Sequence, residues 1–107
     1  DFTIEASPTA NVNSEFKKIH QRKIYNSHID CLGHVNNIYY GKFAYDAFSE
    51  AECTNIHNLK RMDIYFKSEL KNNDIFSILK AYENNKILVR GYNDTGSENS
   101  FDAIFEF

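Results

Sequence analysis

The fold of this chain is decided by the segment Ile29-Asp30-Cys31-Leu32-Gly33-His34-Val35-Asn36-Asn37-Ile38-Tyr39-Tyr40. It places an acid, a turn glycine and a histidine immediately before a run of residues that can form a helix. Such a layout brings a carboxylate, an imidazole and the unpaired N–H groups of a helix start to one point. That combination can polarise a carbonyl group and activate water. A plain turn with a helix-capping residue uses the same residue types, so the surrounding sequence must decide between the two interpretations.

A long helix follows the segment. Apolar side chains from Val35 to about Glu52 cover most of a helical circumference, which predicts a helix wrapped by other elements. Before the segment, residues from Glu15 to about Ser27 look extended. Ile19 and Ile24 do not share a face of a regular strand, so this strand either contains a bulge or is buried on both faces.

Strands dominate the rest of the chain, because apolar and polar residues alternate there with a period of two. The alternating runs are Met62 to Lys67, Ile75 to Tyr82, Ile87 to Tyr92 and Phe101 to Phe107. Turn residues at 83–85 and 93–96 predict hairpins between the last three runs. The order of elements predicts an α+β fold, in which an antiparallel sheet of about five strands wraps one long central helix.

Domain organisation follows from the same pattern. Residues 15–107 form one domain, and the polar stretch 1–14, which holds the single proline, reads as a leader or linker. A sheet of about five strands leaves open edges, so we expect a homodimer or a higher homo-oligomer that continues the sheet.

The composition narrows the classes of partner and compartment. A net charge of −3, with only a mild basic patch from Phe16 to Lys23, argues against nucleic acid as a partner. The sequence contains no run of 18 apolar residues, so it predicts no membrane-spanning helix. Cys31 and Cys53 lack metal-binding spacing, so we expect no metal, no cofactor and reduced thiols in the cytoplasm. The chain begins with Asp1, which suggests a processed chain; a plastid-like organelle, after removal of a targeting peptide, is the alternative location.

The motif Asp30-x-x-Gly33-His34-Val35-Asn36-Asn37-x-x-Tyr40 resembles the signature of hotdog-fold thioesterases, most closely that of the acyl-acyl-carrier-protein (acyl-ACP) thioesterases. The run from Met62 to Leu70 is similar to the second-strand block of that family. The resemblance covers roughly residues 15–107 and implies a single hotdog fold, similar to the second of the family's two repeats.

The chain departs from the family pattern at several positions. Plant-type members carry asparagine at the position of Leu32, where it belongs to their proposed catalytic network. His28 stands where an aspartate is frequent, and Leu70 stands where plant members have a cysteine. Phe43 replaces the usual tryptophan of the helix.

The resemblance and the chemistry of thioester hydrolysis together nominate site residues. We expect Asp30 to act as base or nucleophile, His34 to orient water or to bond Asp30, and Glu69 to be the second catalytic acid. The N–H groups at the helix start would polarise the carbonyl. Expected substrate-binding residues are Gly33, Val35, Asn36, Asn37 and Tyr40.

The predicted function is hydrolysis of acyl thioesters, foremost fatty acyl-ACP. An acyl-CoA thioesterase of the 4-hydroxybenzoyl-CoA type is the first alternative. A non-catalytic hotdog module that binds acyl groups or only dimerises is the second. The partner is therefore an acyl thioester carried by ACP or CoA.

Overall fold

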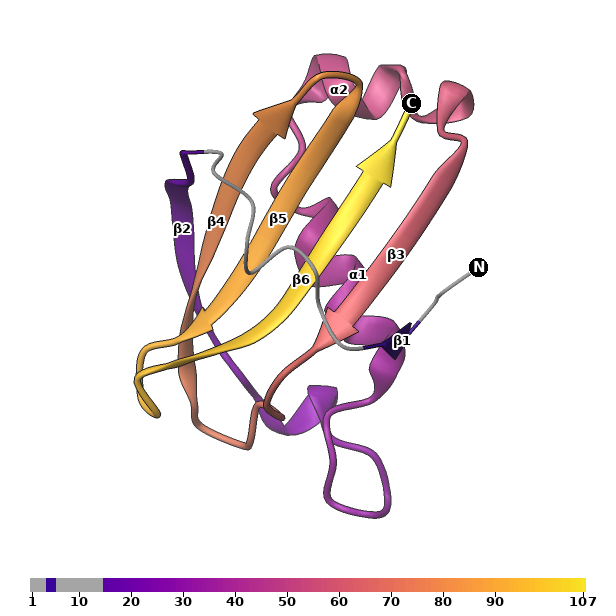
Figure 1. The fold of residues 1–107 in the computed structure, drawn as a ribbon. Coiled ribbons are helices and arrows are strands. Elements are labelled where there is room, and N and C mark those ends of the chain that lie inside the picture. Colours follow the sequence, from indigo (N-terminus) through magenta and orange to yellow (C-terminus); the bar gives the residue numbers. More distant parts are fainter. Residues whose placement is uncertain (1–3, 6–14) are drawn as a thin grey trace.

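The computed structural model describes residues 4–5 and 15–107. Its strands form one sheet (Figure 1). Its order is β1-β3-β6-β5-β4-β2, and every neighbouring pair is antiparallel except the short β1 with β3. The strands are β1 (Ile4–Glu5), β2 (Lys17–Lys23), β3 (Arg61–Phe66), β4 (Ile75–Glu83), β5 (Lys86–Asn93) and β6 (Glu98–Glu106). The five strands β2 to β6 confirm the predicted antiparallel sheet.

Two tight turns set the register of the last three strands. Asn84, with φ of 53°, turns β4 into β5, and Ser97, with φ of 56°, precedes β6. Val89 therefore pairs with Lys80 on one side and with Ala103 on the other. The alternation seen in the sequence then directs one set of side chains towards the helix.

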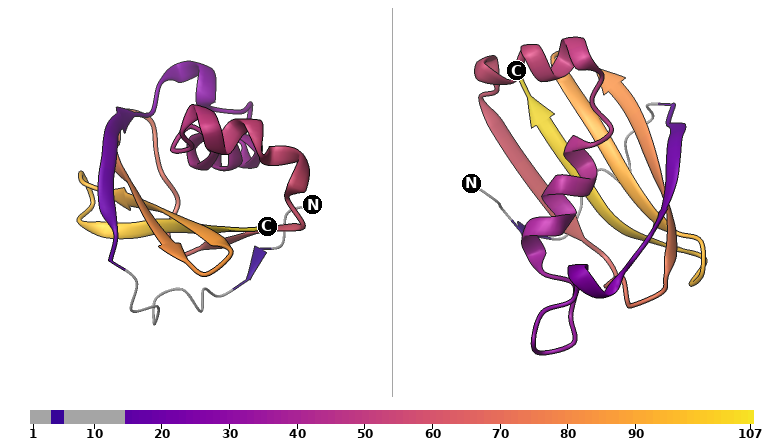
Figure 2. Two further views of the ribbon diagram at one scale, coloured as in Figure 1. Left: turned by 90° about the horizontal axis from the view of Figure 1, so that it is seen from above. Right: turned by 180° about the vertical axis from the view of Figure 1, so that it is seen from behind.

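The helical segment crosses one face of the sheet and is broken once (Figure 2). Helix α1 (Asn37–Tyr45) is followed by helix α2 (Glu50–Thr54), so the single helix predicted from Val35 to about Glu52 is two helices. The break lies at Ser49, whose side chain accepts a hydrogen bond from the Glu52 N–H while the Glu52 carboxylate accepts one from the Ser49 N–H. This capping box starts a new helix in a different direction. A short 3-10 helix (Ile56–Asn58) leads from α2 to β3.

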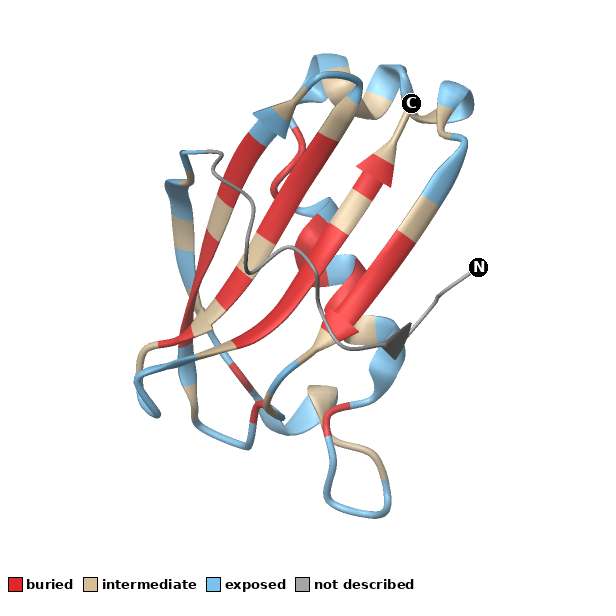
Figure 3. Cartoon of the chain, in the orientation of Figure 1, coloured by how far each residue is buried: buried red, intermediate tan, exposed pale blue. Residues whose placement is uncertain are grey.

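The hydrophobic core lies between α1 and the sheet, whose strands β3 to β6 are buried over much of their length (Figure 3). Aromatic side chains link the helix to the sheet. Phe43 of α1 lies 5.0 Å from Phe76 of β4, and Tyr40 lies 5.3 Å from Phe101 of β6, measured between ring centroids. All four side chains are at most 2% exposed. This packing fixes α1 on the sheet and so fixes the position of the segment that precedes it.

Strand β2 contains a bulge. Its register against β4 shifts between Lys18 and His20, which leaves Ile19 45% exposed while Ile24, just beyond the strand, is fully buried. Of the two explanations open from the sequence, the bulge is therefore confirmed.

A buried lysine ties the second helix to the sheet. The Lys80 ammonium donates hydrogen bonds to the Ala47 carbonyl, at 2.8 Å, and to the Glu52 carboxylate, which also accepts one from the Tyr82 hydroxyl. We call Glu52, Lys80 and Tyr82 the Lys80 cluster. Burial opposes ionisation of Glu52, but the bonds from Lys80 and Tyr82 outweigh it and lower the pKa of Glu52 to about 2.

The predicted leader or linker 1–14 lies outside the described residues apart from β1, whose Ile4 pairs with Ile64 of β3. The boundary at residue 15 stays a prediction. None of the helices among the described residues combines the length and apolar character needed to cross a membrane.

Candidate active site

The loop before α1 is a narrow turn built by its own backbone. The Asp30 N–H donates to the His34 carbonyl at 2.8 Å, and the Asn36 N–H donates to the His28 carbonyl at 3.1 Å. Between these bonds, Ile29 and Val35 form an antiparallel bridge. Gly33 adopts a φ of 82° at the tip, a conformation that side chains disfavour. The turn thereby holds His34 and Val35 next to the first residue of α1.

The Asp30 carboxylate closes this turn. Its Oδ1 atom accepts hydrogen bonds from the N–H groups of Leu32, at 2.9 Å, and His34, at 3.1 Å. Asp30 therefore acts on His34 through the backbone, and it does not line the pocket described below.

The start of α1 offers N–H groups to the same region. The Asn36 side chain caps the helix by accepting from the Ile38 N–H at 3.1 Å, and Asn37 is the first helical residue, whose N–H has no partner within the helix. The Val35 N–H points away from the bridge with Ile29, and no acceptor for it occurs in residues 4–5 and 15–107. These two donors lie at the positive end of the helix dipole.

Opposite the turn lies the segment after β3. The Ser68 hydroxyl donates to the Asn99 carbonyl at 2.9 Å, and the Ser100 hydroxyl donates to the Ser68 carbonyl at 2.7 Å. The Leu70 N–H donates to the Tyr40 hydroxyl of α1 at 3.1 Å. Glu69 is thus held between an anchor on β6 and an anchor on the helix.

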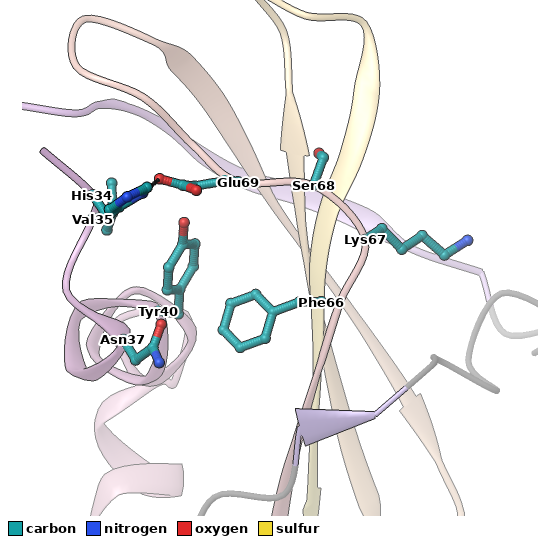
Figure 4. A pocket seen from close by; sticks show the side chains of 8 residues that line it. All are labelled: His34, Val35, Asn37, Tyr40, Phe66, Lys67, Ser68 and Glu69. Carbon is teal, nitrogen blue, oxygen red and sulfur yellow. Dashed lines mark hydrogen bonds and ion pairs between the residues drawn. The ribbon is translucent and has the colours of Figure 1, made fainter. Parts of the chain in front are cut away.

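His34 and Glu69 meet across the gap (Figure 4). The His34 Nδ1 atom lies 2.6 Å from Glu69 Oε1, and their side chains are 59% and 43% exposed. The hydrogen bond with Glu69, reinforced by the charges of Glu69 and Asp30 against a small effect of burial, raises the pKa of His34 above its ordinary value.

Beneath this pair is a cavity of about 350 Å³. Its floor is aromatic, with the Tyr40 and Phe66 rings edge to face and their centroids 4.7 Å apart. The lining residues are His34, Val35, Asn37, Tyr40, Phe66, Lys67, Ser68 and Glu69. Figure 4 shows the Tyr40 hydroxyl pointing up towards the His34–Glu69 pair and the Lys67 side chain pointing away from it.

Five of the eight nominated residues meet at this cavity, and three support it from the turn. The five are His34, Glu69, Val35, Asn37 and Tyr40. The three are Asp30, Gly33 and Asn36. Sequence reasoning did not nominate Phe66, Lys67 and Ser68, although they directly precede Glu69 in the strand block. Among the described residues, no three His, Cys, Asp or Glu side chains gather as metal ligands would.

The arrangement combines a carboxylate–imidazole pair, unpaired N–H groups and an apolar floor. The N–H groups can stabilise negative charge on a carbonyl oxygen. The pair can bind and deprotonate a water, and the floor can hold an apolar chain.

Known proteins resemble this chain both in sequence and in structure. The family model described as "Acyl-ACP thioesterase C-terminal domain" matches residues 10–107. Among solved structures, an acyl-ACP thioesterase from Bacteroides thetaiotaomicron shares 20% identity with a TM-score of 0.71, over 98% of this chain and 40% of that one. This chain therefore spans about two fifths of that protein. No curated protein sequence matches.

Two further structures are similar in fold. A Staphylococcus aureus protein solved in complex with CoA shares 13% identity with a TM-score of 0.67, over 86% of this chain and 74% of that one. A 1,4-dihydroxy-2-naphthoyl-CoA thioesterase from Synechocystis shares 12% identity with a TM-score of 0.64, over 85% and 79%. At these identities the likeness concerns the fold alone.

Proposed function

Because this chain belongs to the acyl-ACP thioesterase C-terminal domain family, we propose that its pocket hydrolyses acyl thioesters. The predicted resemblance and the predicted hotdog fold are both confirmed. The observation that carries the proposal is the His34–Glu69 pair, which lies above an aromatic pocket at the start of α1.

The proposed reaction uses each part of the site once. Water attacks the carbonyl carbon of the thioester while Glu69 takes its proton, and His34 holds the carboxylate in place. The N–H groups of Val35 and Asn37 stabilise the oxyanion that forms. The carbon–sulfur bond then breaks, and the thiol leaves with a proton returned by the pair. The products are the free acid and the thiol of the carrier.

Asp30 and Glu69 are the two candidates for the base. The sequence nominates Asp30, whereas the geometry favours Glu69, since the Asp30 Oδ1 atom already accepts two backbone hydrogen bonds. We propose that Asp30 positions His34 and that Glu69 takes the proton.

Separate substitutions distinguish these roles. Glu69→Gln should abolish most hydrolysis without changing stability, because the residue is partly exposed. Asp30→Asn keeps an oxygen that can accept the turn's hydrogen bonds, so it should retain most activity. Glu98→Gln, an exposed glutamate in β6, is the matched control. Inactivity of Asp30→Asn together with full activity of Glu69→Gln would reverse the assignment.

For the substrate we propose a fatty acyl group on ACP. Basic side chains support this choice: β2 carries Lys17, Lys18, Arg22 and Lys23, and an acidic carrier is attracted to such a strand. Arg22 is already paired with Asp46, which leaves the three lysines for a carrier.

Rates on ACP and CoA thioesters of the same acyl group test the choice of carrier. We expect a higher kcat/KM for the ACP thioester than for the CoA thioester, and a loss of that preference in a Lys17→Glu/Lys18→Glu variant. The kcat/KM for the ACP thioester should also decline as the salt concentration rises. Equal rates on both carriers would favour the CoA alternative. If the wild type hydrolyses no thioester of any chain length, the non-catalytic module remains.

We also propose that the domain assembles with a second hotdog unit, most simply as a homodimer. Support comes from the outer edge of β3. Among the described residues, only the two residues of β1 pair with this edge, opposite Ile64 and Tyr65, so the rest of β3 can pair with another strand. Light scattering of the purified chain measures its mass in solution, and a monomer at all concentrations would contradict the proposal.

A further inference from the structure

Tyr40 places a hydroxyl group inside the candidate active site. It is the fourth residue of α1, and its side chain is buried, with 2% of the residue exposed. Long side chains on a helix lean towards its N-terminus, so the hydroxyl lies at the end of α1 where the unpaired N–H groups are. Figure 4 shows it below the His34–Glu69 pair.

The hydroxyl oxygen is fixed, but its proton is not used. The oxygen accepts the Leu70 N–H at 3.1 Å. A phenol is both donor and acceptor, so that bond leaves the O–H proton available. No group in the described part of the chain accepts a hydrogen bond from it.

Tyr40 also stays protonated. Burial, the main cause, raises the pKa of its phenol to about 12. The group is therefore a neutral donor throughout the pH range in which a thioesterase operates. A buried donor without an acceptor is costly, and a bound ligand that supplies an acceptor removes that cost.

We propose that the Tyr40 hydroxyl donates a hydrogen bond to the carbonyl oxygen of the bound thioester, alongside the N–H groups at the start of α1. This inference rests on the proposed function, because it assumes that a thioester occupies the pocket. The carbonyl carbon must lie within reach of a water held by Glu69, and its oxygen must face the helix start. The Tyr40 hydroxyl borders the same space.

A direct test measures the carbonyl bond. The probe is a ketone analogue of an acyl-CoA, with methylene in place of sulfur and ¹³C at the carbonyl, which cannot be hydrolysed. The stretching frequency of this carbonyl, measured by infrared spectroscopy, should fall on binding to the wild type. On binding to Tyr40→Phe it should lie closer to its value in solution. Tyr39→Phe is the matched control, because Tyr39 is on the same helix but does not line the pocket. An identical stretch in wild type and Tyr40→Phe, or no binding of the probe, would overturn the proposal.

Rates provide a second readout. Tyr40→Phe should lower kcat by about 100-fold with little change in KM, as removal of an oxyanion donor does. Tyr40→Phe should still lower the residual rate of the Glu69→Gln variant, because the oxyanion also forms when water attacks without the base. If Tyr40→Phe has no effect in the Glu69→Gln background, the hydroxyl acts by positioning Glu69, and the proposal fails.

Two controls keep the conclusions separate. If Tyr40→Phe does not fold, 3-fluorotyrosine at position 40 retains the hydroxyl as a stronger donor and should lower the stretch further; an unmoved stretch would count against the proposal. A wild type that shifts the probe but hydrolyses no thioester leaves this inference standing and removes the proposed function. A wild type that hydrolyses thioesters but leaves the carbonyl stretching frequency of the probe unchanged supports the proposed function and overturns this inference.

Discussion

Replacement of Glu52 by alanine should destabilise the domain severely, because it removes the counter-charge of a buried lysine. Lys80 is 6% exposed, and its ammonium donates hydrogen bonds to the Glu52 carboxylate and the Ala47 carbonyl. Breaking such a buried pair costs about 3–5 kcal/mol, since the remaining charge is left without its partner. The substitution also removes the carboxylate that caps the Ser49 N–H.

The pKa of Glu52 gives an independent magnitude. Its folded pKa of about 2 lies below its ordinary value of 4.5, which corresponds to about 3 kcal/mol of stability. The sign follows from linkage: between these values the unfolded chain binds more protons than the folded one. The stabilisation is therefore complete above pH 4.5 and is lost as the pH falls towards 2. The two estimates agree.

Urea unfolding at neutral pH measures this cost. With a slope of about 1–3 kcal/mol per molar urea, a loss of about 3 kcal/mol moves the midpoint by about 1–3 M. The difference between wild type and Glu52→Ala should narrow at pH 3. The double variant Glu52→Ala/Lys80→Met should recover part of the loss, and Glu50→Ala, an exposed residue of the same helix, should change little. An unchanged midpoint in Glu52→Ala would refute the reasoning.

Three further predictions concern the site and the sheet. We expect His34 to titrate above 6.5 and its pKa to fall in Glu69→Gln, because the carboxylate stabilises the imidazolium; NMR of the ring protons measures both, and an unaffected pKa contradicts the pairing. Gly91→Ala should cost about 1–3 kcal/mol of unfolding free energy, because its Cβ would lie 2.1 Å from the buried Phe101 ring; an unchanged melting temperature would be inconsistent with that contact. Phe66→Ala removes part of the pocket floor and should move the preference in kcat/KM towards longer acyl chains, so an unchanged chain-length profile would show that the floor does not limit the substrate.

Much of the fold could be predicted because its signals are local. The period-two alternation and the turns at Asn84 and Ser97 lie within a few residues of the hairpins they form. The break between α1 and α2 also had a local signal, the Ser49-x-x-Glu52 capping box, but the apolar residues continue past it and suggested one helix. Strand β1 has two residues, too few for any periodic pattern.

The site was less accessible to sequence reasoning, because its defining contact is long-range. His34 and Glu69 are 35 positions apart, and nothing in either segment indicates that they bond each other. The sequence instead suggested that His34 orients water or bonds Asp30, which lies four positions earlier in the chain. Lys80 looked like one more residue of an alternating strand, since its partner Glu52 is reached only through the packing of α2 on the sheet.

The basic edge strand has a consequence for solubility. A strand at the edge of a sheet has unpaired backbone groups that can recruit another chain into disordered aggregates. Here that strand is β2, and lysines at both its ends would bring like charges together if two copies paired through it. The bulge after Lys18 further interrupts the straight ladder that such pairing needs. The same residues proposed to attract an acidic carrier therefore discourage the protein from polymerising with itself.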